Sequence, residues 1–140
     1  MGGRRATGWA QPFFELESYR VIVADGEDVR HDTEAIVKLK VNGERVLRIG
    51  EGNGPVNALD AAVRAAIGSQ YPQLAKVHLT DFKVRVLDTA KGTGAVTRVL
   101  IDSTNGRRSW STIGVSENII QAAWQALEDS LVFGLLHTTE

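Results

Sequence analysis

The sequence predicts an α+β fold made of two β-β-β-α repeats with pseudo-two-fold symmetry, whose helices pack on antiparallel sheets. The segments YRVIVAD (19–25) and FKVRVLD (82–88) match at a fixed offset at four positions: Tyr19 with Phe82, Val21 with Val84, Val23 with Val86 and Asp25 with Asp88. Both alternate apolar and polar residues, as half-buried strands do. Each is followed by two further β-rich segments and then by a helical pattern. A repeat of this length predicts two similar halves that share one core.

The other expected strands are 34–41, 45–50, 94–101 and 109–114. Asn-Gly stands before the third strand of each repeat, at 42–43 and at 105–106. This dipeptide favours a two-residue type I′ hairpin, because both central positions need positive φ. In the first hairpin, that loop would place Val37 opposite Arg48. A three-residue loop would place Val37 opposite Ile49 and match the apolar faces better, so the register stays open.

The expected helices are 55–67 and about 117–136. Both have an apolar face at the i, i+3, i+4 spacing. Pro55 suits a first helical turn, and either Asn53 or Gly54 is expected to cap that helix. Ser116 is the expected cap of the second helix. Alanine fills an unusual share of both helices, which allows close approach to a sheet or to a partner subunit.

The composition excludes several classes of function. A length of 140 residues suits one domain or two very small ones, and a net charge of −1 gives no basic patch for nucleic acid. There is no cysteine for disulfides, thiolate chemistry or metal thiolates, which fits a reducing cytoplasm. No apolar run has the ~18 residues that a membrane span needs, so no membrane partner is expected.

No motif predicts an active site, and no metal or cofactor is expected. The histidines His31, His78 and His137 are far apart and have no metal-ligand spacing. KGTGAVTR (91–98) resembles part of a phosphate loop, but it lacks the Lys-Ser/Thr ending and precedes a strand. Five carboxylates fall in one expected loop, where solvated charge is the ordinary interpretation: Asp25, Glu27, Asp28, Asp32 and Glu34.

GEGNGPVNALDAAVRAAI (50–67) places glycines at the start of the first helix. Free N–H groups at a helix start favour a carboxylate or phosphate, and glycine lets such a ligand come close. The alternative is that the glycines only shape a strand-to-helix turn. The pattern by itself favours the turn.

Three long motifs resemble the C-terminal regulatory domain of the 2-isopropylmalate synthase family: GNGPVNALDAAVRAAI, VHLTDFKVRVLD and WSTIGVSENIIQAAWQALEDSLVFGLL. The last motif most resembles the citramalate synthase branch, and the likeness covers about residues 14–136. The family implies a dimeric domain of two β-β-β-α units that binds the end-product amino acid near the dimer interface as a feedback inhibitor. Its enzymes condense acetyl-CoA with a 2-oxo acid, pyruvate in the citramalate branch, on a metal-bearing barrel.

A chain of 140 residues cannot hold a barrel of about 250. The resemblance therefore implies the regulatory part alone: residues 1–13 a tail or a segment of artificial origin, and 14–140 the domain, with repeats at about 18–70 and 76–136. Such a chain is not expected to catalyse the condensation by itself. Its implied partners are a second copy, the parent enzyme's barrel and an amino acid. A dimerisation module without a ligand is the main alternative, and a small enzyme built on the loop carboxylates ranks last.

The resemblance also assigns an effector site. Backbone N–H groups of the loop would receive the carboxylate, side chains of the helix and of the second repeat would form an apolar wall, and Asn57 or a loop carboxylate such as Asp88 would hold the ammonium group. The residues are Gly52, Asn53, Gly54, Pro55, Val56, Asn57, Leu59, Asp88 and Ala95. The sequence does not separate leucine from isoleucine, since one methylene is worth only ~1–3 kcal/mol. The citramalate branch favours isoleucine.

Overall fold

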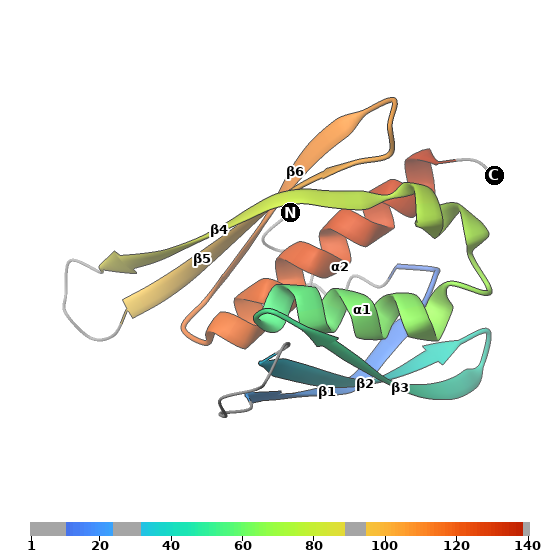
Figure 1. Ribbon diagram of the computed structural model, residues 1–140, viewed down its shortest axis with the longest axis horizontal. Coiled ribbons are helices and arrows are strands. Elements are labelled where there is room, and N and C mark those ends of the chain that lie inside the picture. The colour runs from blue at the N-terminus through green and yellow to red at the C-terminus, as the bar shows by residue number, and fades with distance from the viewer. Residues whose placement is uncertain (1–10, 24–31, 89–94, 139–140) are drawn as a thin grey trace. The chain divides into compact units, whose positions relative to one another are not determined.

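The computed structural model describes residues 11–23, 32–88 and 95–138 (Figure 1). They form two compact units, Met1–Gln70 and Tyr71–Glu140, each with the element order β-β-β-α. The elements of the first unit are β1 (Glu15–Val23), β2 (Thr33–Val41), β3 (Glu44–Gly52) and α1 (Pro55–Ile67). Those of the second are the 3-10 helix η1 (Pro72–Lys76), β4 (His78–Asp88), β5 (Ala95–Thr104), β6 (Ser109–Ser116) and α2 (Ile119–His137). The predicted α+β fold with two β-β-β-α repeats is confirmed.

In the first unit, β1, β2 and β3 form an antiparallel sheet in that order, and α1 packs mainly on β2 and β3. The hairpin register that the sequence left open is the two-residue one, because Val37 pairs with Arg48. Asn42 and Gly43 have φ values of 53° and 82°, as a type I′ turn requires. Ile49 therefore lies on the face opposite Val37, where it is 58% exposed.

Glycines on β3 explain why this register is favoured. Gly50 and Gly52 pair with Ala35 and Thr33, so they lie on the face that meets α1. A Cβ at Gly52 would come within 2.7 Å of the Asn57 Cβ, and one at Gly50 would meet the Ala62 backbone nitrogen. A shift by one residue would turn both glycines away and force larger side chains against the helix.

In the second unit, β4, β5 and β6 form the corresponding antiparallel sheet, and α2 packs on β5 and β6. Gly114 of β6 takes the place that Gly50 has on β3. A Cβ at Gly114 would meet the carbonyl oxygen of Ala122 and come within 2.9 Å of the Ala126 nitrogen. Each helix therefore lies directly against a glycine of the third strand.

The second hairpin differs from the prediction. Thr104 pairs with Ser109, so the loop has four residues, and only Gly106 within it has positive φ. The predicted type I′ turn at Asn105-Gly106 is wrong. The Asn105 side chain instead accepts hydrogen bonds from the N–H groups of Arg107 (3.0 Å) and Arg108 (2.9 Å), which stabilises a wider turn.

The helices follow the expected ranges. α1 spans the predicted 55–67, with Gly54 as its N-cap. α2 begins at Ile119, and its N-cap is Asn118 rather than the predicted Ser116. The Ser116 hydroxyl accepts from the Asn118 N–H (3.1 Å) and so supports the cap from outside the helix.

The glycine–helix contact predicts unequal effects of two alanine substitutions. Gly114→Ala should lower the free energy of unfolding by about 3 kcal/mol, because the new methyl group would overlap the backbone of α2. Gly106→Ala should cost about 1 kcal/mol, because it adds only backbone strain at a φ of 90° with no atom within 4 Å of its Cβ. Urea unfolding of the three proteins measures both values. Equal losses would contradict the close contact.

Candidate functional site

The predicted effector loop lies between the end of β3 and the start of α1. Gly52 ends the strand, Asn53 and Gly54 form the link, and Pro55 is the first helical residue. Gly54 has a φ of 95°, and its Cβ position has no atom within 4 Å. The glycines thus differ in role: Gly52 lets the helix approach the strand, whereas Gly54 supplies the positive φ and leaves open space at the helix start.

The free N–H groups at the helix starts of the two units have different hydrogen-bond partners. In α2, the Asn118 Oδ1 accepts from the N–H groups of Ile120 (2.8 Å) and Gln121 (3.2 Å). In α1, the N-cap is Gly54, which has no side chain to make such a bond. Pro55 has no N–H, so the first-turn donors of α1 are those of the two residues that follow it. A helix start without a side-chain cap offers donors and a positive dipole end to an anion.

A carboxylate that the sequence analysis assigned to a solvated loop lies at this helix start. The Oδ1 of Asp32 accepts from the Gly54 N–H at 3.1 Å and from the Thr33 hydroxyl at 2.9 Å. The two partners Asp32 and Gly54 are 22 residues apart. The β2–β3 pairing, which joins Thr33 to Gly52, brings them together. Only this pairing, and no local motif, identifies Asp32 as a neighbour of the loop.

The other predicted site residues fall into three groups. Val56 and Leu59 are buried, with 3% and 0% of their surface exposed. Asn57 is exposed, and its Nδ2 donates to the Asn53 carbonyl at 3.3 Å. Asp88 and Ala95 pair with each other in the second unit.

One turn further along α1, Asp60 and Arg64 form an ion pair, with 2.9 Å between the Arg64 Nε and the Asp60 Oδ1. Burial of the Asp60 side chain raises the pKa of its carboxyl above the usual value of 3.8, and the Arg64 charge and hydrogen bonds oppose that rise. Desolvation is the larger effect.

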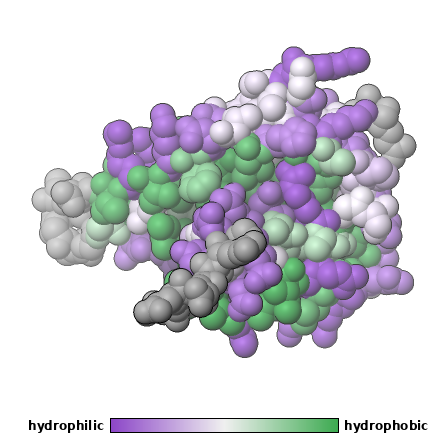
Figure 2. All heavy atoms as spheres, in the orientation of Figure 1, coloured by the Kyte–Doolittle hydropathy of each residue, from purple (hydrophilic) through white to green (hydrophobic). Residues whose placement is uncertain are grey.

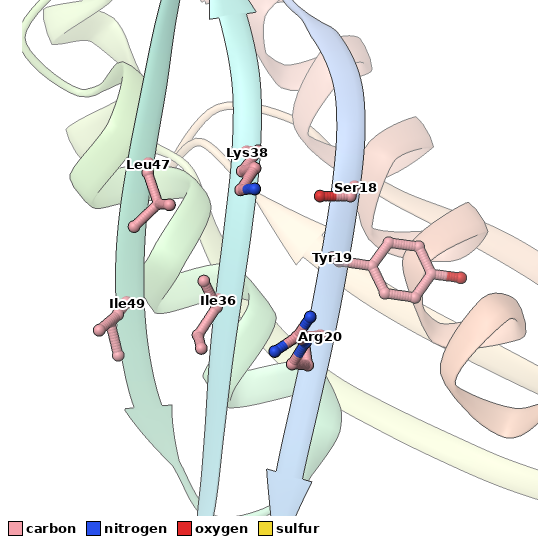
Figure 3. Close-up of a pocket in the computed structure, with 7 residues that line it drawn as sticks. All are labelled: Ser18, Tyr19, Arg20, Ile36, Lys38, Leu47 and Ile49. Atoms are coloured by element: carbon pink, nitrogen blue, oxygen red, sulfur yellow. The ribbon is translucent and has the colours of Figure 1, made fainter.

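A shallow hollow of about 350 Å³ lies on the face of the first sheet opposite α1 (Figure 3). Its lining residues are Ser18, Tyr19, Arg20, Ile36, Lys38, Leu47 and Ile49. Leu47 and Ile49 are 46% and 58% exposed, so the hollow is an open part of the sheet surface. The predicted effector residues are not among those that line it.

The described part of the chain has neither a cluster of metal ligands nor a membrane-spanning helix. No group of three or more His, Asp or Glu side chains in residues 11–23, 32–88 and 95–138 is arranged to hold a metal ion. His31, Asp25, Glu27, Asp28 and residues 91–94 lie outside the described residues. Within the described segments, no helix is long and apolar enough to span a membrane.

The family comparison decides the assignment. Residues 4–134 match the sequence model of the LeuA allosteric (dimerisation) domain. The chain belongs to this family. The resemblance inferred from the three motifs is therefore confirmed, and the chain is a regulatory dimerisation domain of the kind found in citramalate and 2-isopropylmalate synthases.

Similar proteins favour the citramalate branch of the LeuA family. The (R)-citramalate synthase of Streptomyces coelicolor is 51% identical over 131 residues, which cover 94% of this chain and 24% of that protein. The (R)-citramalate synthase of Synechocystis sp. is 46% identical over 94% of this chain and 25% of its own length. The 2-isopropylmalate synthase of Shewanella woodyi is more distant, at 27% identity over 84% of this chain and 20% of its own. The chain spans about a quarter of the length of these citramalate synthases.

The raised pKa of Asp60 predicts a pH-dependent stability of this LeuA domain. Because the folded state holds the Asp60 proton more tightly than the unfolded state, this group contributes stability at low pH that is lost as the pH rises through its raised pKa. The free energy of unfolding of the wild type relative to Asp60→Asn should therefore fall as the pH rises from about 3 to 7.

Urea unfolding at a series of pH values measures this difference. Asp81→Asn, which removes an exposed carboxylate from β4, is the control for a general change in net charge. A difference that grows with pH would mean that the Arg64 ion pair, rather than burial, dominates at Asp60.

Proposed function

We propose that this chain is the effector-binding regulatory domain of a citramalate synthase and that it binds isoleucine at the start of α1. The parent enzyme would condense acetyl-CoA with pyruvate on a separate catalytic barrel. The citramalate synthases at 51% and 46% identity support this branch. The domain alone would bind the amino acid and associate with a second copy, but it would not catalyse the condensation.

The observation that carries the proposal is the difference between the two helix starts. Repeated units would be expected to cap their helices alike, and in α2 the Asn118 side chain binds two N–H groups. The first unit has Gly54 at the corresponding position, and a glycine has no side chain with which to cap α1. A bound carboxylate would take the place of the missing cap, accepting from the N–H groups of Val56 and Asn57.

Asp32 supports an amino acid rather than a simple anion. Its carboxylate lies at the Gly54 N–H, so a negative charge is present beside the donors of the helix start. A free amino acid carries both charges on adjacent groups. Its ammonium group would lie against Asp32 while its carboxylate met the helix, and Asp32 thereby joins Asn57 as an ammonium partner.

The apolar wall proposed for the branched side chain is open to a ligand only if α1 shifts on the sheet, because its two helix residues are packed into the core. Val56 and Leu59 are buried on the side of α1 that faces the core. A mainly apolar pocket with a few polar groups for orientation is the usual composition of a small-molecule site.

Inhibition would follow from a difference in affinity between two states of the parent enzyme. If isoleucine binds one arrangement of the regulatory dimer better than the other, it shifts the attached barrel toward the less active state. The size of the inhibition is set by that difference and not by the affinity itself.

Calorimetric titration of this chain with isoleucine, leucine and valine tests the proposal. Gly54→Val should weaken isoleucine binding at least tenfold, because the side chain would fill the open space at the helix start. Gly106→Val is the matched control: Gly106 also has positive φ (90°) and no atom within 4 Å of its Cβ, but it lies in the turn of the second unit. It should bind isoleucine like the wild type.

Each alternative gives a different result. Leucine binding more tightly than isoleucine would keep the effector site and transfer the chain to the 2-isopropylmalate synthase branch. A folded dimer that binds no amino acid would favour a ligand-free dimerisation module. Equal loss of affinity in both valine variants would mean that general strain, and not the loop, controls binding.

A further inference from the structure

The face of the first sheet opposite α1 has two cations without an acidic partner. Arg20 of β1 and Lys38 of β2 are both exposed, and both line the hollow of about 350 Å³. Arg20 pairs with Ile36 and Lys38 pairs with Ser18, so the two cations lie on neighbouring strands, one row apart. Within the described ranges, no ion pair involves either of them. A negative group between them would therefore meet two charges that no carboxylate of these ranges neutralises.

A bulge in β1 explains why these cations have no partner. The pairing register shifts between Leu16 and Ser18, which leaves Glu17 as an extra residue. Its carboxylate contacts the Arg45 Nε at 2.8 Å and the Lys40 Nζ at 3.8 Å. Glu17 thus neutralises the cations at one end of the sheet face and not those of the hollow.

Apolar side chains form the other half of the hollow. Leu47 pairs with Lys38, and Ile49 pairs with Ile36. In Figure 3, each of these two rows runs from an apolar side chain on β3 to a polar side chain on β1, and the Ser18 hydroxyl points toward β2. Over β1–β3, in the lower part of Figure 2, hydrophobic and hydrophilic residues lie side by side. The hollow therefore offers apolar contact and positive charge to the same ligand.

No carboxylate lines the hollow. Glu34 and Glu51 share its sheet face, but they pair with each other one row beyond it. An amino acid bound here would bring its ammonium group close to Arg20 or Lys38, and like charges repel. The hollow is thus suited to a carboxylate without an ammonium group. The start of α1 differs, because the Asp32 carboxylate lies there.

We propose that this hollow is a second ligand site and that it binds a short, branched aliphatic carboxylate without an ammonium group, of the 2-oxo acid class. The carboxylate would lie between Arg20 and Lys38 and accept from the Ser18 hydroxyl. The aliphatic part would lie on Ile36 and Leu47. A volume of about 350 Å³ is at the lower end for small-molecule sites, which suits a small acid. The site lies on the opposite face of the sheet from α1 and does not depend on the proposed isoleucine site.

A titration followed by ¹H–¹⁵N correlation spectra of the 140-residue chain tests this site, because such spectra locate weak binding residue by residue. The ligand is 3-methyl-2-oxopentanoate, which is isoleucine with an oxo group in place of the ammonium group. It should shift the amide signals of residues 18–20, 36–38 and 47–49 saturably, with a dissociation constant of about 1–10 mM. Isoleucine should leave these signals in place. So should 3-methylpentan-2-one, in which a methyl group replaces the carboxylate.

Two lysines of β2 supply matched variants. Lys38→Met should weaken binding of the oxo acid about fivefold, because it removes one of the two exposed cations. Lys40→Met is the control, since Lys40 lies on the same strand and the same face but contacts Glu17 and does not line the hollow. It should change the affinity by less than about twofold. A variant with both Arg20→Gln and Lys38→Met should show no saturable shift, and the dispersion of its spectrum checks that it folds.

Four results would overturn the proposal. The first is no shift at these residues up to about 50 mM oxo acid. The second is equal binding of the uncharged ketone or of isoleucine in the hollow, which would mean that the cations select nothing. The third is an equal effect of Lys38→Met and Lys40→Met. The fourth is a set of shifts confined to residues 53–57, which would place the oxo acid at the start of α1.

This experiment and the titration with isoleucine fail independently. Gly54→Val should abolish the shifts caused by isoleucine and leave those caused by the oxo acid unchanged. A chain that binds the oxo acid in the hollow but no isoleucine would refute the proposed effector site and leave the second site supported. A chain that binds isoleucine at α1 and no oxo acid would do the reverse.

Discussion

The close contact between a third-strand glycine and its helix is the constraint on which the rest of each unit depends. At Gly50 and at Gly114, the helix backbone occupies the space where a Cβ would lie. This contact requires alanine or a similarly small residue on the facing helix turns, which Ala62 and Ala122 supply. It also holds the helix over the second and third strands. The uncovered first strand follows from the same geometry, since a helix placed there cannot also cover it.

The two units share this contact but differ where the helix begins. Asn118 closes the start of α2 with its own side chain, whereas the start of α1 has Gly54 and the distant carboxylate of Asp32. A cap contributes about 1 kcal/mol, so its absence from one of two repeated helices has a cost in stability. A site for a ligand would explain why the first unit keeps a glycine there, because a ligand carboxylate restores the missing bonds when it binds.

Local patterns predicted most of the fold, and failures occurred where a long-range contact decides the outcome. Alternation and periodicity place all six strands and both helices, because each pattern reflects one buried face. The register at Asn42-Gly43 depended on which face meets α1, and that was decided by Gly50 and Gly52 rather than by the larger apolar residues. The Asn105 side chain bonds its own turn and overrides the type I′ preference. The sequence indicated the glycine loop but not Asp32, which only strand pairing brings to it.

The proposed effector site and the uncovered part of the sheet lie on different strands of the first unit. Gly54 follows β3, and Val23, which is 68% exposed, lies on β1, with β2 between them. Any movement of α1 on β3 would change how much of the sheet face beneath the helix remains open for a partner. A ligand that fixes the start of α1 would therefore favour one arrangement of the dimer. Because coupling of binding equilibria is reciprocal, association would then tighten the binding of the amino acid by the same factor. Regulation would then depend on the position of α1, because that position affects both the effector site and the surface left open to a partner.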